Sequence, residues 1–415
     1  MEKNTKFSGY KIAVACFVIM FVHMGALGCM GVFMPHIASN NGLEIGRLSL
    51  MVSLATGAAA VASIVLAAPL MKLLTPKWLI FVISFFIAGH FIGFSFSRTY
   101  AQNYICGTIG GVCIALGTTG AISNILGEWF IEKRAAVIGI VVGGASFGTA
   151  VFQAIGGVLI DSIGYRTTYQ IMAAFVFVIA IVVNLCFVRT PKQLGQKPLG
   201  WREDSTGQAS EAVTGGVTLS QAVRSPAFYL IFVGVVFGGV AWTGFKTFMT
   251  TMLLQYGYST IVSANYSAFM NAMAAVMIIA GGFLAQKMGN VAYMVFLYAT
   301  CFVGCLIIFL TGSSISTILL CVAIILGASS TCSVSALPPT ICTEAFGNKD
   351  YGRIIVFVLA AGYAGQALSS IIANGLLGKG WTWNMIYMAF GVCAVAALVF
   401  YLIGRSIAPY RRTMK

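Results

Sequence analysis

The sequence predicts an all-α integral membrane protein with twelve transmembrane helices in two six-helix halves. Of its 415 residues, 59% are hydrophobic and only 8% are charged, and the mean hydropathy is +0.94. Soluble domains carry about 25% charged residues, so this composition excludes that class. Apolar runs recur along the whole chain, each long enough to cross a hydrocarbon core of roughly 30 Å. A single long polar segment, residues 190–225, separates six runs from six.

Short separators that carry charges or turn-forming residues define the six spans of the first half. The first apolar run is longer than the hydrophobic part of a signal peptide and has no convincing cleavage site, so we expect it to remain as a helix. The expected spans are 10–36, 47–71, 78–97, 101–127, 135–160 and 166–188.

The second half is read in the same way and follows a linker rich in Gly, Ser, Thr, Gln and charge. We therefore expect an N-terminal six-helix bundle at 1–189, a cytoplasmic linker at 190–225 and a C-terminal bundle at 226–415. The six spans of that bundle are expected at 227–256, 261–286, 290–311, 315–342, 352–378 and 382–404.

The two halves also repeat a pattern of residues around the ends of the fourth and tenth spans. Duplicated six-helix halves joined by a long loop are typical of transporters whose site lies between the halves near the midplane. The repeated residues, at a constant offset of 216, are Gly111, Glu128, Phe130 and Lys133, which recur as Gly327, Glu344, Phe346 and Lys349.

Lysine and arginine are distributed unevenly over the loops. If the amino terminus lies inside, 19 of the 24 fall in cytoplasmic segments and four in outer loops, and the one left over is Lys246. Cytoplasmic loops carry the excess of basic residues, so we expect a multi-pass protein of the plasma membrane with both termini cytoplasmic. This asymmetry and contact with anionic lipid account for the net charge of +14 without a nucleic-acid partner. We expect a monomer in the bilayer.

Several kinds of chemistry find no support in the sequence. All eleven cysteines fall within apolar segments, which predicts packing roles and neither disulfides nor a metal site. There is no Walker motif, and no nucleophile–base pair or metal cluster lies inside the spans. We therefore expect no cofactor, no direct use of ATP and no enzymatic activity.

Four stretches resemble the major facilitator superfamily, and within it the branch of monocarboxylate transporters and oxalate:formate antiporters. They are WFIEKRAAVIGIVVGGASFG at 129–148, GVFMP at 31–35, TLSQAVRSPAFYLIF at 218–232 and DSIGYRTTY at 161–169. The resemblance implies the twelve-helix fold, alternating access, and a central cavity lined by spans 1, 4, 7 and 10.

The chain departs from that branch where the branch binds its substrates. Members of the branch carry a basic residue on the eighth helix, and monocarboxylate carriers carry an acidic one there as well. This eighth span offers only Asn265, Tyr266 and Asn271, and Gln366 lies in the eleventh span, where another basic residue is expected. The resemblance therefore implies the fold more firmly than the substrate.

Lys246 is the main candidate for substrate binding, with Trp242 and Thr243 beside it on the seventh span. A lysine in the bilayer interior costs about 2.5–3.5 kcal/mol on insertion scales. All ten acidic residues fall in loops or at helix ends, so no intramembrane carboxylate is available as a partner, and the carboxylate of a substrate could take that place. The alternative is that the long side chain snorkels to the outer interface, roughly 15 Å of helix away at Tyr256.

Further candidates for the substrate site are polar or aromatic residues within the spans. Each has a packing alternative, because intramembrane hydroxyls and amides also join helices and aromatic rings also anchor them. These candidates are Thr119, Asn124, Tyr266, Asn271, Ser333, Tyr363 and Gln366.

Histidines titrate near neutrality and are therefore candidates for proton coupling. His23 lies on the first span, which the resemblance places at the cavity, so it is the candidate proton carrier. His90 lies on the third span and is expected to pack within the scaffold.

The charged residues near the cytoplasmic ends of the helices and the glycines of the fifth span each have two interpretations. Glu128, Arg134, Glu344 and Arg353 are predicted to form a cytoplasmic gate, with ordinary solvated loop charges as the alternative. On the fifth span, the spacing Gly144-xxx-Gly148 allows close helix approach. This spacing would allow the fifth span to slide against the eighth span during alternating access, or it would serve static packing alone.

Together these features predict a secondary transporter of small organic anions, most simply monocarboxylates, acting as a proton symporter or an anion exchanger. The alternatives are an exporter of amphipathic compounds and a transporter-like membrane sensor. Exporters of cations usually hold an intramembrane acid, which this chain lacks.

Overall fold

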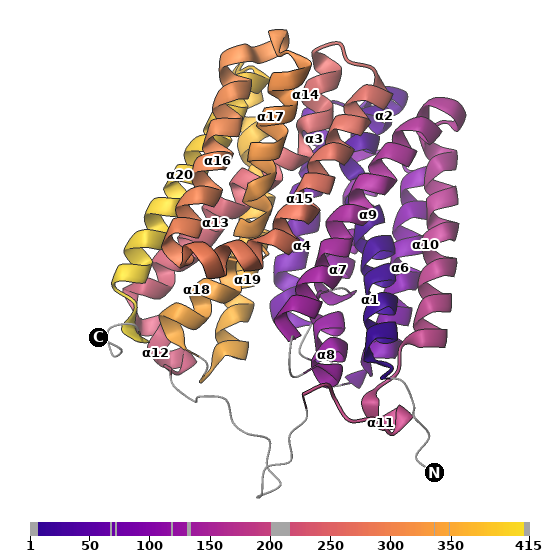
Figure 1. Ribbon diagram of the computed structural model, residues 1–415. Helices are drawn as coiled ribbons and strands as arrows, with labels where there is room; N and C mark the ends of the chain where they lie inside the picture. Colours follow the sequence, from indigo (N-terminus) through magenta and orange to yellow (C-terminus); the bar gives the residue numbers. More distant parts are fainter. Residues whose placement is uncertain are drawn as a thin grey trace, which may run out of the picture.

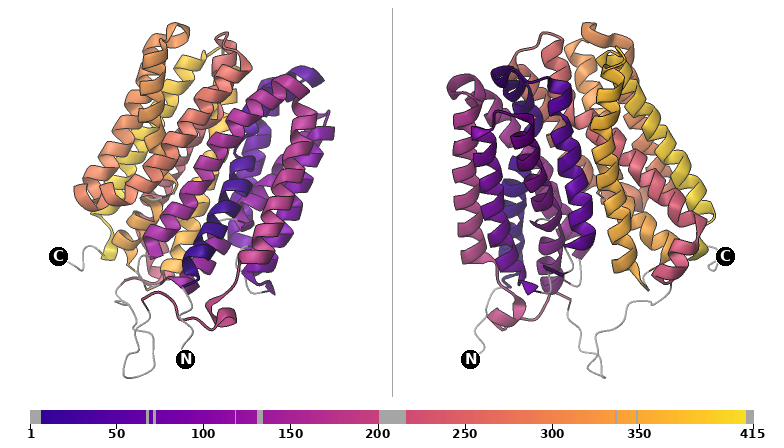
Figure 2. Two further views of the ribbon diagram at one scale, coloured as in Figure 1. Left: turned by 45° about the vertical axis from the view of Figure 1, so that its right-hand side comes forward. Right: turned by 180° about the vertical axis from the view of Figure 1, so that it is seen from behind.

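In the computed structural model, residues 7–66, 69–70, 73–117, 119–130, 134–200, 216–335, 337–347 and 349–410 are described. They form two helical bundles that stand side by side in all views (Figures 1 and 2). The short helices α11 (Pro191–Leu194) and α12 (Leu219–Arg224) lie at the end of the bundles where α1 begins and α20 ends. We name this end the linker side and the opposite end the far side.

The first bundle contains helices α1 to α10. They are α1 (Gly9–Leu27), α2 (Met30–Asn41), α3 (Ile45–Leu48), α4 (Leu50–Val65), α6 (Pro76–Phe96), α7 (Tyr100–Gly117), α8 (Thr119–Trp129), α9 (Arg134–Ile163) and α10 (Tyr165–Phe187). The second bundle contains α13 (Pro226–Thr247), α14 (Met249–Gln255), α15 (Thr260–Met288), α16 (Asn290–Thr311), η1 (Gly312–Ser314), α17 (Thr317–Ala328), η2 (Ser329–Ser333), α18 (Leu337–Phe346), α19 (Tyr351–Leu377) and α20 (Trp383–Ser406).

Ten helices among the described residues are long and apolar enough to cross a membrane. The two remaining predicted spans, 101–127 and 315–342, are each divided into shorter helices: α7 with α8, and α17 with η2 and α18. The first and seventh spans are also interrupted, between α1 and α2 and between α13 and α14. Such interruptions are tolerated at membrane depth where the freed backbone groups are buried in protein or line a cavity.

The entry into the second bundle follows from the local sequence. The Thr218 hydroxyl accepts from the backbone N–H of Gln221 and the Gln221 side chain accepts from the N–H of Thr218, which forms a capping box at the start of α12. The Ser225 hydroxyl then caps α13, and Pro226 occupies the first helical turn, where no backbone donor is needed. These residues lie within the stretch that resembles the family's entry into its seventh helix.

The two bundles meet along two helix pairs, α4 with α19 and α9 with α15. On the far side, Asn374 donates to the Ser49 hydroxyl at 2.6 Å. About one turn further along α4, Ser53 donates to the carbonyl of Ala367 at 2.7 Å. Both serines lie at the far-side start of α4, so these bonds tie the two halves together on that side.

Close packing explains the paired glycines of α9. A Cβ on Gly144 would lie 2.9 Å from the ring of Phe17, and one on Gly148 would lie 2.1 Å from the carbonyl oxygen of Phe21, so both glycines admit α1 of the same bundle. Gly143 instead faces Ile279 on α15, at 3.1 Å. The Gly144-xxx-Gly148 pair therefore serves packing within the first bundle, and the contact with the eighth span uses other residues.

Candidate functional site

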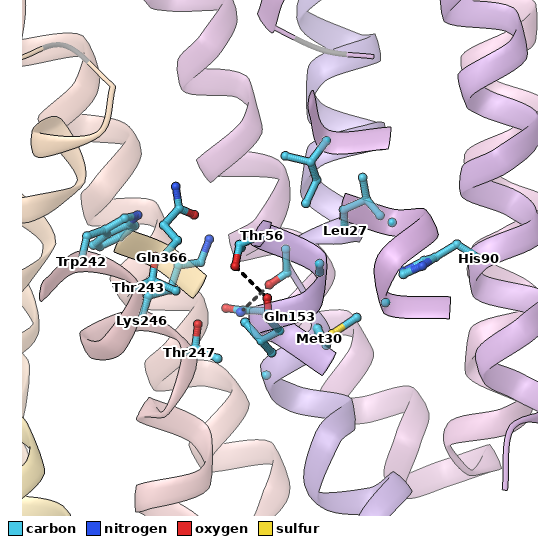
Figure 3. A pocket seen from close by; sticks show the side chains of 17 residues that line it. Leu27, Met30, Thr56, His90, Gln153, Trp242, Thr243, Lys246, Thr247 and Gln366 are labelled. Atoms are coloured by element: carbon cyan, nitrogen blue, oxygen red, sulfur yellow. Dashed lines mark hydrogen bonds between the residues drawn. The ribbon is translucent and has the colours of Figure 1, made fainter. Parts of the chain in front are cut away.

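A cavity of about 140 Å³ lies between the two bundles (Figure 3). It is bordered by the junction of α1 and α2, by α4, α6, α7 and α9 of the first bundle, and by α13 and α19 of the second. The lining residues are Leu27, Gly28, Met30, Gly31, Val52, Ala55, Thr56, His90, Gly107, Gly110, Ile114, Gln153, Trp242, Thr243, Lys246, Thr247 and Gln366.

Two interrupted helices meet at this cavity. α1 ends at Leu27 and α2 begins at Met30, while α13 ends at Thr247 and α14 begins at Met249. Gly31 lies against the Thr247 carbonyl, since a Cβ at position 31 would be 3.1 Å from that oxygen. The cavity therefore sits where the first and seventh spans, which occupy equivalent places in the two halves, are both broken.

Lys246 lines the cavity from the last turn of α13. Its Nζ lies 5.7 Å from the centre of the Trp242 ring. A cation over an aromatic face gains about 0.5–2 kcal/mol, and a cation at a helix C-terminus gains about 0.3–1 kcal/mol. These contacts offset part of the cost of placing lysine at membrane depth.

None of the described residues lining the cavity is acidic, so the site carries uncompensated positive charge. Thr243 and Trp242 are both 6% exposed, and Gln366 approaches from α19 of the same bundle. In Figure 3, Trp242, Thr243, Lys246 and Gln366 form one group, and His90 lies on the other side of the view. An ammonium, a hydroxyl, an amide and an indole are well suited to hold a small anion with a short apolar part.

Four of the ten sequence-predicted substrate residues are thus brought together, and the others have separate placements. Asn271 is buried behind the cavity wall and donates to Gln153 Oε1 at 2.9 Å. Ser333 donates to the carbonyl of Gly238 at 3.2 Å inside the second bundle. Tyr266 packs edge-on against Tyr258, and Tyr363 lies one turn before Gln366 without lining the cavity. The side chains of Thr119 and Asn124 lie outside the described part of the structure.

Gln153 connects the cavity to the contact between the bundles. Its Nε2 donates to the carbonyl of Gly28, at the break in the first span, at 3.3 Å. Its Oε1 accepts from Asn271 on α15, and Asn271 also donates to the Ser267 carbonyl at 2.8 Å. A single buried amide therefore links the broken helix of one half to the other half.

His23 lies inside the first bundle, away from the cavity lining. The Ser84 hydroxyl donates to the Ile80 carbonyl at 2.7 Å, so it accepts from Nε2 of His23 at 3.0 Å. The Nδ1 of His23 is buried without a partner among the described residues. This geometry joins α1 to α6.

The predicted gate residues also have particular placements. Arg405 on α20 pairs with Glu344 at 2.5 Å, and Asn290 donates to the same carboxylate at 3.0 Å. Glu344 is therefore bound within its own bundle. Glu128 and Arg353 are exposed, and the side chain of Arg134 lies outside the described residues.

His90 is the cavity residue that sequence reasoning assigned to scaffold packing. It is 2% exposed, and its Nδ1 lies 2.6 Å from the carbonyl of Cys106 on α7. Gly110 makes room for the imidazole, because a Cβ there would lie 2.4 Å from Cε1 of His90. Of the three glycines at 107, 110 and 111 on the fourth span, only Gly110 marks this contact, because the other two make room for the backbone of α4 at Met51 and Ala55.

Comparison with known proteins places this geometry in context. The profile of the Major Facilitator Superfamily matches residues 16–345. An MFS-type transporter of Gibberella moniliformis (strain M3125 / FGSC 7600) is 23% identical over 331 residues, which cover 76% of this chain and 73% of that protein. MFS-type transporter 1 of Ophiocordyceps sp. (strain BCC 1869) is 25% identical over 188 residues, 44% of this chain and 41% of that protein.

A solved structure matches over nearly the whole length. The crystal structure of a bacterial homologue of the human lysosomal transporter Spinster, in an inward-facing and unoccupied conformation, superposes with a TM-score of 0.70. The match covers 99% of this chain and 98% of the other, at 17% sequence identity, and shows a shared fold.

Proposed function

The chain belongs to the major facilitator superfamily and is a multi-pass membrane transporter, and we propose that it carries small organic anions, chiefly monocarboxylates, by alternating access. The observation that supports the anion is Lys246, which lines a cavity with no acidic residue among its described lining. In an environment of low dielectric a cation without a counter-ion is unfavourable, so an anion from solution is the missing partner.

The size and charge of the cavity narrow the class of substrate. One ammonium balances one carboxylate, which favours a monoanion over a dianion. A cavity of about 140 Å³ favours a small acid over a large amphipathic compound. The Trp242 ring and Leu27 offer apolar surface for a short hydrocarbon part, while Thr243 and Gln366 offer hydrogen bonds that orient the carboxylate.

Alternating access requires the far-side contacts to break. The bonds of Ser49 and Ser53 to α19 hold that side together in the present state. We propose that the linker side is cytoplasmic, because 19 of the 24 basic residues fall on that side in the predicted topology. The state described here is then the one closed to the outside, and rocking of the two bundles about the cavity opens the far side.

Joining Ser49 to Asn374 is expected to stop transport. In a Ser49→Cys, Asn374→Cys variant, a short bifunctional thiol reagent would tie α4 to α19 at the far side, so the outward-open state could not form. The measurement is substrate uptake before and after treatment, with the Ser49→Cys and Asn374→Cys single substitutions as controls for modification alone. Full activity of the cross-linked protein would show that the far-side contact does not open during the cycle.

The direct test of the proposed function is transport by purified protein in proteoliposomes. A thermal-shift screen against small carboxylic acids first identifies a ligand, and uptake of that radiolabelled acid into the vesicles is then measured. Saturable uptake identifies a carrier, whereas binding without uptake identifies a sensor with the carrier fold. Stabilisation by organic cations and not by acids would contradict the anion assignment.

A further inference from the structure

We propose that His90 is the proton-binding site of the cavity, which deepens the proposed function by assigning a proton-coupling residue. His23, the histidine that the sequence favoured, donates to Ser84 within the first bundle and does not line the cavity. His90 is a cavity-lining residue on α6, a helix that sequence reasoning treated as scaffold.

The hydrogen bond of Nδ1 fixes the tautomer of His90. The Cys106 carbonyl can only accept, so at 2.6 Å the proton of the neutral imidazole must sit on Nδ1. Nε2 then carries the lone pair and is the atom that can accept a proton. His23 has the opposite arrangement, because its Nε2 donates to a hydroxyl whose own proton is already used.

Contacts on several sides of the ring support its orientation. Phe91 and Phe94 contact it edge-on, with ring centres 5.0 and 4.8 Å from that of His90. Gly110, which itself lines the cavity, would place a Cβ 3.2 Å from Nε2. The Nδ1 bond and these contacts leave Nε2 beside the cavity wall formed by α7.

No described carboxylate lines the cavity to hold His90 permanently charged. The titratable groups on the elements around it include Cys106, Cys113, Tyr100 and Tyr104 on α7, Tyr169 on α10, which stacks on Phe94, Cys29 between α1 and α2, and Lys246 across the cavity. Because Lys246 is a cation, His90 takes up a proton less readily in the empty cavity than when a bound anion offsets that charge. Anion and proton therefore favour each other's binding.

The charges balance for electroneutral symport. The empty cavity has one positive charge on Lys246 and a neutral His90. Binding one monocarboxylate and one proton from the same side adds a negative and a positive charge, so the loaded cavity again carries one positive charge. The proton joins Nε2 on one side and leaves it for water on the other, while the Nδ1–H bond to Cys106 persists.

Nitrogen NMR of protein labelled with ¹⁵N-histidine tests the site without a transport assay. The chain has three histidines, so the resonances are assigned with His23→Gln and His36→Gln variants, and His90 stays intact. We expect neutral His90 to show the Nδ1–H tautomer and to become protonated at Nε2 on acidification, at higher pH when lactate is present. An Nε2–H tautomer, or no protonation of His90 with or without lactate, overturns the proposal.

Transport of radiolabelled lactate is the second test of the proposal. In a His90→Gln variant we expect loss of accumulation driven by a pH gradient, with lactate counterflow at equal pH retained; His23→Gln is expected to keep both. Loss of gradient-driven accumulation in His23→Gln but not in His90→Gln overturns the proposal. If wild-type protein carries no lactate but His90 still titrates at Nε2, the proton site stands and the proposed carriage of monocarboxylates fails for this probe.

Discussion

Replacement of Lys246 by glutamine is expected to abolish anion uptake while leaving the stability of the protein unchanged or raised. Removing one partner of a buried charge pair costs about 2–5 kcal/mol of binding, which is about 30-fold to several thousand-fold in affinity. The same change relieves the cost of about 2.5–3.5 kcal/mol of holding a lysine at membrane depth. Binding should therefore be lost without any loss of stability, which a general folding defect cannot produce.

The measurement pairs uptake in proteoliposomes with the midpoint of thermal unfolding in detergent. Lys287→Gln is the matched control, because Lys287 is a lysine in the last turn of α15 that is exposed and outside the cavity. Lys246→Arg keeps the charge and should retain part of the activity. Normal anion uptake by Lys246→Gln would remove the basis for the anion site, whatever its effect on stability.

The overall fold was predictable because a bilayer imposes a coarse rule on the chain. Each span must contain enough apolar residues to cross the hydrocarbon core, and that signal survives without any knowledge of packing. The interruptions within spans were not predictable from hydropathy. Residues 27–30 and 246–249 are as apolar as their surroundings apart from Lys246 and Thr247, so hydropathy does not mark the breaks between α1 and α2 or between α13 and α14.

Part of the candidate site was predictable for a different physical reason. Lys246 stood out because a charge in a bilayer is costly, and its neighbours Trp242 and Thr243 followed from the sequence. The position of His90 at the cavity was not predictable, because α6 is apolar around its whole circumference. The sequence of such a helix does not indicate which face meets a cavity. The same limit applies to Asn271, which is buried one layer behind the cavity wall and holds Gln153 in place.

The ion-pair partners of the charged residues near the linker side were also not predictable from the sequence. Glu344 and its counterpart Glu128 were grouped by their matching positions in the two halves. In the structure the partner of Glu344 is Arg405, 61 positions along the chain at the end of α20. Sequence spacing identifies pairs within one helix, but a pair formed between helix ends depends on how the bundle closes.

Replacing Gly148 by alanine is expected to destabilise the first bundle. Alanine substitutions at Gly139 and Gly143 on the same helix, α9, then distinguish a role in static packing from a role in helix movement. The new Cβ would lie 2.1 Å from the carbonyl oxygen of Phe21, and a backbone oxygen cannot move aside without shifting α1. Overpacking of this kind costs about 1–3 kcal/mol. At Gly139, nothing lies within 4 Å of the added methyl, so alanine there should be neutral or stabilising by up to about 1 kcal/mol.

Gly143 provides the third member of the series, because its Cβ would meet the flexible side chain of Ile279 across the contact between the bundles, at 3.1 Å. The Ile279 side chain can shift to accommodate the methyl group in the conformation described here, so the Gly143→Ala variant should unfold near the wild-type temperature. If α9 slides along α15 during transport, the same variant should nevertheless carry substrate more slowly. A slow but stable Gly143→Ala variant together with an unstable Gly148→Ala variant would assign movement to one glycine and static packing to the other. A Gly148→Ala variant as stable as the wild type but inactive would instead place movement between α1 and α9, within a bundle that alternating access otherwise treats as rigid.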